Sequence, residues 1–298
     1  MREETWPNFF IVGAVKSGTT SLYAYLAQHP DVFMPAIKEP HFFAQAQPSA
    51  EQRYLVTVIN DRSAYLRLFR KARGFRAIGD ASPSYLWDPQ APYRIRQAVP
   101  EARIIILLRD PVERAFAHYL MDFHEGVQDL PFYEALKRDM GRARKGWGVS
   151  QLYVELGQYA DQVARYLDVF GPPQVQVLLF NELQQDARLV VERTVRFLAL
   201  PATPAAAIDT SKIHNGYSET RGAWARRLAG RPWARVIGQR LVPVGLQQFL
   251  WTRLFSRPGR KPVIDPRARE LLCSIYRPEM ERLESVLGRA LPEMRCSW

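Results

Sequence analysis

The chain has 298 residues, of which 47% are hydrophobic and 24% charged, and this composition supports one large or two small folded domains with a buried core. Its longest apolar runs fall short of the roughly 20 residues that a membrane span needs, and Glu3 and Glu4 precede the first of them, so we expect neither a transmembrane helix nor a secretory leader. Cys273 and Cys296 are too few for a disulfide framework or a zinc site, and a reducing, cytoplasmic setting is expected.

Apolar runs and helical periodicity alternate along the chain. Strands are predicted at 9–12, 77–79, 103–108 and 175–180. Helices are predicted at 20–28, 110–125, 158–170, 186–199 and 267–287, with Gly171 and Gly288 as helix stops. Strands that alternate with helices form a parallel sheet covered on both faces, so the fold class expected is α/β, with ligands at the carboxyl ends of the strands.

The first predicted strand runs into a cluster of glycine, lysine and hydroxyl residues, GAVKSGTTS at 13–21. Such a turn before a helix presents backbone N–H groups to a phosphate or sulfate. Gly13 and Gly18 have the spacing of a nucleoside-triphosphate P-loop, but Thr19 stands where that loop carries its lysine. The lysine is Lys16, inside the loop. The cluster therefore predicts an anion site and counts against ATP or GTP hydrolysis.

A second candidate anion ligand follows the predicted strand 103–108. Arg109 stands before Asp110 and Pro111, a pair typical of a helix start. A guanidinium group at this place can bind a phosphate through two parallel hydrogen bonds.

Most of the net charge of +11 lies in one segment. Residues 220–264 contain ten basic residues and no acidic one, interleaved with aromatic and aliphatic residues as in amphipathic helices. One interpretation is a helical lid packed on the core. The other is a helix pair that contacts an anionic membrane surface.

Two separated segments, KSGTTSLYAYLAQHPDV and LLRDPVERAFAHYL, resemble the phosphate-binding motifs of sulfotransferases that use 3′-phosphoadenosine 5′-phosphosulfate (PAPS). Other segments are similar along most of the chain, among them KEPHFF at 38–43, GDASPSYL at 79–86 and HNGYSETRG at 214–222. The motifs are most similar to those of heparan-sulfate-type and bacterial carbohydrate sulfotransferases. The resemblance implies a P-loop-like parallel sheet flanked by helices. It also implies one domain over 1–298, with 220–264 as a mostly helical insertion or lid.

The resemblance implies roles for individual residues. Lys16 would stabilise the leaving oxygen, and Glu39 would be the base that removes the acceptor proton, with His41 as the alternative base. The cofactor-binding residues implied are Lys16, Ser17, Gly18, Thr19, Thr20, Ser21, Arg109, Asn215 and Arg221. A purely structural role stays open for both candidate bases. Glu39 would then form a surface ion pair with Lys38, and His41 would be a packed or hydrogen-bonded ring. No metal is expected.

Two positions depart from the family pattern. Ala117 stands where the family has a serine that accompanies Arg109, which predicts weaker cofactor binding or a substitute donor such as His118. Ala81 stands where heparan-sulfate-type relatives often carry lysine, which counts against a polyanionic glycan acceptor.

The function expected is transfer of a sulfuryl group from PAPS to a hydroxyl of an acceptor, with an amine as the second choice. The acceptor expected is a carbohydrate, a glycolipid or a small natural product, held by variable loops at 44–76, 122–156 and 222–262. Two other functions remain as alternatives, a P-loop kinase and a basic nucleic-acid-binding protein.

Overall fold

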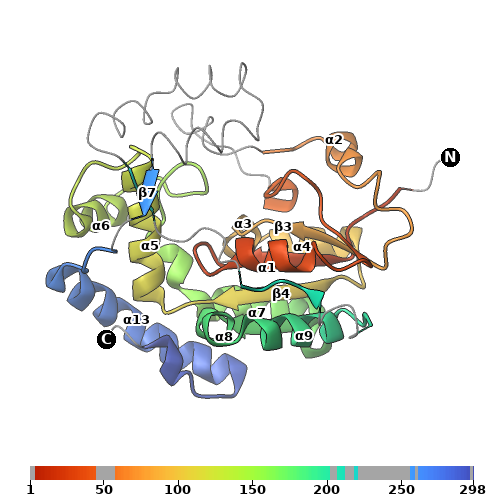
Figure 1. Ribbon diagram of the computed structural model, residues 1–298. Coiled ribbons are helices and arrows are strands. Elements are labelled where there is room, and N and C mark those ends of the chain that lie inside the picture. The colour runs from red at the N-terminus through yellow and green to blue at the C-terminus, as the bar shows by residue number, and fades with distance from the viewer. Residues whose placement is uncertain are drawn as a thin grey trace.

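The computed structural model describes residues 4–44, 58–201, 207–211, 218–220, 256–258, 261–295 and 298. Five strands form one parallel sheet in the order β2-β3-β1-β4-β5 (Figure 1). They are β1 (Phe9–Gly13), β2 (Val32–Phe33), β3 (Ala77–Ala81), β4 (Arg103–Leu108) and β5 (Val175–Leu179). The predicted α/β class with a central parallel sheet is confirmed.

Helices cover both faces of this sheet, and the side chains of each strand alternate between two cores. Phe10 and Ile104 belong to one core, and Phe9 and Ile105 belong to the other. The first core is closed by α3 (Ser84–Trp87), α4 (Ala91–Ala98), α7 (Tyr159–Phe170) and α13 (Pro266–Leu287). The second core is closed by α1 (Thr19–Leu26), α8 (Phe180–Gln185) and α9 (Ala187–Phe197).

A third apolar cluster lies beyond the carboxyl end of β4. It is formed by α5 (Pro111–His124), α6 (Phe132–Met140), Tyr153 and Val154 just before the 3-10 helix η2 (Glu155–Gly157), and the first half of α13 (Figure 1). The Asp110 carboxylate starts α5 because it accepts from the N–H groups of Val112 at 2.9 Å and Glu113 at 3.2 Å. The remaining short elements are η1 (Phe42–Ala44), α2 (Arg62–Arg67), η3 (Pro172–Gln174), η6 (Pro292–Met294), β6 (Ser218–Thr220) and β7 (Ser256–Pro258).

Helix α13 joins the first and third clusters. Met280 and Leu283 are fully buried in the first cluster, and the Tyr276 hydroxyl donates to the Val154 carbonyl at 2.9 Å. Its approach to η2 is so close that a Cβ on Gly157 would lie 2.6 Å from the Tyr276 hydroxyl oxygen. The last helix is therefore built into the core.

The nine predicted elements are all present, with ends within two residues of those expected. Gly171 and Gly288 end their helices with left-handed φ values of 76° and 63°, as predicted. The sequence did not predict β2, α2, α3, α4, α6 or α8, each of which has nine residues or fewer.

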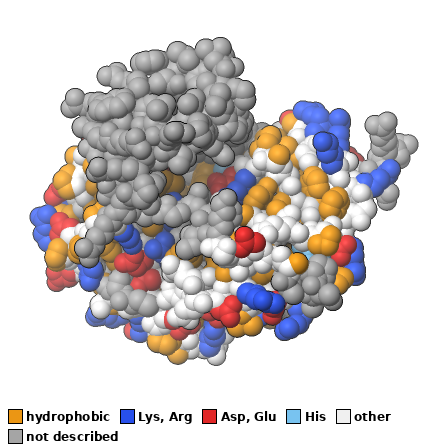
Figure 2. All heavy atoms as spheres, in the orientation of Figure 1, with side chains coloured by type: hydrophobic (Ala, Val, Ile, Leu, Met, Phe, Trp, Pro, Cys, Tyr) orange, Lys and Arg blue, Asp and Glu red, His pale blue; other side chains and the backbone are white. Residues whose placement is uncertain are grey.

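Several predictions fall outside the described residues. Asn215, Arg221, Cys296 and nearly all of the basic segment 220–264 are among them, so the lid and the membrane contact stay predictions. Within the described parts of the chain, no helix combines the length and apolar character needed to cross a bilayer. On the face in Figure 2, basic and acidic side chains are interspersed over the described surface.

Candidate active site

The loop between β1 and α1 has the backbone of an anion cradle. Gly18 is the N-cap of α1 with a φ of 90°, and Lys16 also has a left-handed φ, of 63°. A Cβ on Gly18 would lie 2.9 Å from side-chain atoms of both Phe180 and Leu183, so glycine is required there. Gly18 has no side chain with which to cap the first turn of α1, and a helix N-terminus of this kind can bind an anion.

The hydroxyl residues of the loop lie in this cradle. Ser17, Thr19 and Ser21 are buried, and Thr20 is partly exposed. Among the described residues, the Ser17 hydroxyl interacts with the Tyr159 hydroxyl but forms no hydrogen bond of good geometry. A buried donor in this state fits an anionic group held by the loop.

Lys16 points toward α5. Its Nζ lies 3.7 Å from the Met121 Sδ, and it makes no ion pair with a carboxylate of the described residues. Burial lowers the pKa of the Lys16 ammonium, and the positive charge of Arg109 lowers it further. The negative charges of three carboxylates raise the pKa of Lys16 and so oppose this shift: Glu125, Asp122 and Glu39.

Arg109 joins this loop to the end of β4. Its Nη1 donates to the Lys16 carbonyl at 3.0 Å, and its guanidinium carbon lies 4.5 Å from the centre of the Phe180 ring. The Nη2 is 3.6 Å from a Glu113 carboxylate oxygen, and the Arg109 carbonyl accepts from the Tyr159 hydroxyl at 3.0 Å. The structure therefore brings the two predicted anion ligands together.

Glu39 lies at the carboxyl end of β3, because its N–H donates to the Ala81 carbonyl at 3.2 Å. Its carboxylate pairs with Lys38 and lies 3.9 Å from the His41 Nε2. The side chain is 37% exposed, and its charge acts on Lys16. Glu39 is therefore accessible and lies in the same site as the loop lysine.

His41 is buried, with only 4% of its side chain exposed. Its Nδ1 lies 2.7 Å from the Ser84 hydroxyl oxygen, its N–H donates to the Ser82 hydroxyl at 3.3 Å, and its ring centre is 5.4 Å from that of Trp147. Burial lowers the pKa of His41 to about 4. These are the features of a packed, hydrogen-bonded ring. The ion pair between Lys38 and Glu39, which was the alternative to a catalytic role for Glu39, is also present.

Asp80 is a buried residue of this site that the sequence did not single out. Its carboxylate accepts from the hydroxyls of Tyr65, Tyr85 and Ser82, each at 2.8 Å. Burial raises the pKa of Asp80 to about 6. Because Ser82 also accepts from the His41 N–H, Asp80 fixes the segment that carries Glu39.

A second missed carboxylate, Asp122, lies in α5 next to Met121. It accepts from the Tyr153 hydroxyl at 2.7 Å and is 3.9 Å from the His118 Nε2. Burial raises the pKa of Asp122 to about 7 and lowers that of His118. The four-residue spacing of His118 and Asp122 places both on one helix face, and this spacing could have indicated the pair from the sequence.

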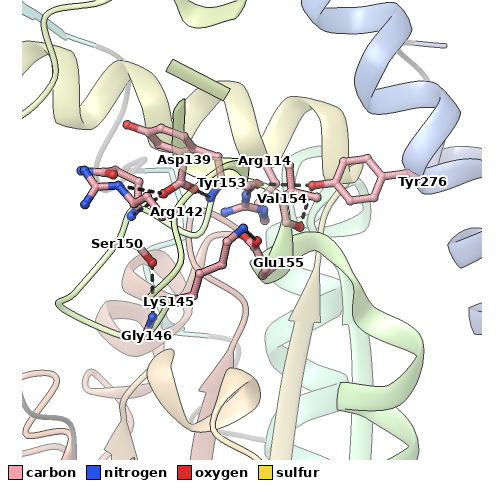
Figure 3. Close-up of polar contacts among 11 residues, drawn as sticks. Arg114, Asp139, Arg142, Lys145, Gly146, Ser150, Tyr153, Val154, Glu155 and Tyr276 are labelled. Carbon is pink, nitrogen blue, oxygen red and sulfur yellow. Dashed lines mark hydrogen bonds and ion pairs between the residues drawn. The ribbon is translucent and has the colours of Figure 1, made fainter. Parts of the chain in front are cut away.

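The segment between α6 and η2 is held against α5 by polar contacts (Figure 3). The Asp139 carboxylate accepts from the N–H groups of Gln151 at 3.0 Å and Tyr153 at 2.9 Å. Lys145 pairs with Glu155 further along the segment. This segment also carries Trp147, which packs on His41, so its position bears on the site.

A sequence profile of the sulfotransferase family matches residues 7–204. The chain belongs to the sulfotransferase family. The solved sulfotransferase from Alicyclobacillus acidocaldarius is 33% identical, with 98% of this chain and 99% of that chain covered and a TM-score of 0.73.

Two curated relatives from Mus musculus are similar over parts of their length. Carbohydrate sulfotransferase 15 is 29% identical over 247 residues, which cover 65% of this chain and 44% of that protein. Bifunctional heparan sulfate N-deacetylase/N-sulfotransferase 4 is 26% identical over 300 residues, which cover 96% of this chain and 31% of that protein. The chain thus spans less than half the length of these relatives.

Proposed function

We propose that this sulfotransferase moves a sulfuryl group from PAPS to a hydroxyl of an acceptor. The observation that carries the proposal is the meeting of three groups at the carboxyl ends of adjacent strands. Lys16 follows β1, Arg109 follows β4, and Glu39 is bonded to the end of β3. Two cations beside a helix N-terminus suit a polyanionic donor, and a carboxylate nearby suits a base.

The cradle fits the donor in both charge and shape. The amides and hydroxyls from Ser17 to Ser21 would hold the 5′-phosphosulfate, and Arg109 would bind the 3′-phosphate. Asn215 and Arg221 would close over the nucleotide. The Ser17 hydroxyl, which forms no hydrogen bond of good geometry among the described residues, and the glycine-only position at Gly18 support this assignment.

When bound, PAPS supplies the activated sulfuryl group. Negative charge grows on the oxygen that leaves the sulfur, and the Lys16 ammonium would stabilise that charge. The Glu39 carboxylate would accept the proton of the acceptor hydroxyl as the new S–O bond forms. The low pKa of His41 and its bond to Ser84 favour Glu39 over His41 as the base.

We place a carbohydrate or glycolipid first among acceptors, and a small natural product second. The relatives are named as a carbohydrate sulfotransferase and a heparan sulfate N-sulfotransferase, which supports glycan acceptors for those proteins. Ala81, buried at the end of β3, brings no cation to the site, which favours an acceptor of low negative charge. The cytoplasmic setting remains a prediction from the sequence.

One pair of assays tests the proposal. Adenosine 3′,5′-bisphosphate (PAP) should raise the Tm without magnesium, and label from [³⁵S]PAPS should appear in a glycan, glycolipid or small-molecule extract. Stabilisation by ATP with magnesium in place of PAP would instead support a kinase. Steeply salt-dependent binding of DNA or RNA, with no PAP binding, would support the nucleic-acid alternative.

A further inference from the structure

Lys16 is a partly buried ammonium, and its one hydrogen-bond contact within the described residues is with a thioether. The Met121 sulfur is a weak acceptor, so it compensates little of the desolvation of the charge. Asp122 is the next residue of α5, and its charge raises the pKa of Lys16. Asp122 thus follows in the sequence the residue that Lys16 contacts. No described residue forms an ion pair with Lys16.

Tyr153 holds this carboxylate in place, because each of its own polar groups is bonded. Its N–H donates to the Asp139 carboxylate at 2.9 Å. Its carbonyl accepts from the Arg114 guanidinium and from the Tyr276 hydroxyl (Figure 3). Its hydroxyl donates to the Asp122 Oδ2 at 2.7 Å. Tyr153, whose hydroxyl binds Asp122, is therefore held in place by two other elements, the end of α6 and α13.

We propose that Asp122 is a positioning residue for Lys16. Held by Tyr153, its carboxylate supplies a buried negative charge behind the loop and keeps the Lys16 ammonium charged and ready for the leaving oxygen. This inference rests on the proposed function of Lys16 in sulfuryl transfer. Asp122 touches neither donor nor acceptor in this role and acts only through the lysine.

The other charges around Lys16 do not duplicate this arrangement. Glu125, whose charge opposes the fall of the Lys16 pKa most, is the C-cap residue that follows α5, Glu39 is partly exposed and paired with Lys38, and Arg109 is a cation. His118 also faces Asp122, with its Nε2 3.9 Å from the carboxylate, and burial holds the pKa of His118 well below its ordinary value. Burial raises the pKa of Asp122 to about 7, while the Tyr153 bond and the Lys16 charge oppose the rise. The carboxylate is thus ionised above neutral pH, where its charge opposes the lowering of the Lys16 pKa by burial.

The direct test measures Lys16 itself. The chain has seven lysines, so the ¹³Cε signals of [¹³C]lysine-labelled protein can be followed against pH, with Lys16→Arg to assign the signal. In Asp122→Asn, which keeps the side-chain shape and the bond from Tyr153, the pKa of Lys16 should fall by roughly one unit. Asp122→Glu should restore most of the shift, and Tyr153→Phe should give a smaller fall.

Asp139→Asn is the matched control. Asp139 is also a buried acceptor of Tyr153, but it is not among the charges that act most strongly on Lys16. This variant should leave the Lys16 titration unchanged. An unchanged pKa in Asp122→Asn, or an equal fall in Asp139→Asn, would overturn the inference.

The same variants are then assayed for sulfuryl transfer. The alkaline limb of kcat should move to lower pH in Asp122→Asn, with the Kd for PAP nearly unchanged at pH 6, where Asp122 is mostly protonated. A shift of the NMR titration without any transfer to any acceptor would refute the proposed function and leave the pairing of Asp122 with Lys16 standing. Transfer with an unmoved alkaline limb would refute the positioning role alone.

Discussion

At the residue scale, the site keeps its charged groups in different environments. Lys16 and Arg109 are both partly buried cations with lowered pKa values, whereas Glu39 is more open to solvent. Two partly buried cations at one site repel each other, and a polyanionic donor bound between them would relieve this repulsion. The two cations should nevertheless contribute to different steps.

Lys16→Ala should lower kcat by a few orders of magnitude with a modest loss of PAP affinity, because its charge is needed mainly as the leaving oxygen becomes anionic. Arg109→Ala should show the opposite pattern, with a large rise in the Kd for PAP. Calorimetric titration with PAP and initial rates at saturating PAPS separate the two effects. Near-normal turnover in Lys16→Ala would remove the lysine from the catalytic step.

Glu39→Gln should lower the transfer rate roughly 10²- to 10⁴-fold, the usual contribution of a positioned base, while PAP binding persists. The amide keeps the shape of the side chain but cannot accept the proton. Rates from pH 5 to pH 9 provide the measurement. Full activity in this variant, together with a loss in His41→Gln, would make His41 the base.

At the element scale, the strands that carry the site were predictable because each is a run of apolar residues followed by a break. The sequence also placed Lys16 and Arg109 at strand ends, which the sheet then brings together. Strand β2 escaped prediction because two residues carry no periodicity. The Asp122–Tyr153 bond joins residues 31 positions apart through a loop, and nothing local in the sequence indicates it.

Gly18→Ala should lower PAP affinity and destabilise the fold by about 1–3 kcal/mol, because it combines backbone strain with overpacking. Its Cβ would meet side-chain atoms of both Phe180 and Leu183 at 2.9 Å, so either these side chains or the start of α1 would have to shift. Gly74→Ala is the control, since Gly74 has a similar φ of 95° but no atom within 4 Å of an added Cβ. Urea unfolding and PAP titration should show the larger loss at Gly18, and equal losses would mean that backbone strain alone matters.

At the scale of the whole molecule, buried ionisable groups make stability depend on pH in opposing directions. Asp122 has a folded pKa of about 7, above its unfolded value, so its contribution to stability is lost as pH rises from roughly 4 to 7. His41 has a folded pKa of about 4, below its unfolded value, so its contribution is lost as pH falls from roughly 6.5 to 4.

Asp122→Asn should therefore become more stable relative to the parent as pH rises, by up to about 4 kcal/mol between pH 4 and pH 8. The asparagine stays neutral, whereas the parent must bury an ionised carboxylate at the higher pH. Urea unfolding at both pH values measures the difference. A pH-independent difference would mean that Asp122 titrates in the folded protein as it does in the unfolded chain.

Because α13 packs into the core, the region that folds as a unit extends beyond the region that matches the family profile. The family profile ends at residue 204 and includes the five-stranded sheet with Lys16, Glu39 and Arg109. A chain cut there would lack Met280 and Leu283 from the core and would leave the apolar side of α7 open to water. We expect such a fragment to aggregate despite carrying these three residues, so boundaries for expression or domain exchange in this family must follow the last helix and not the end of the sequence match.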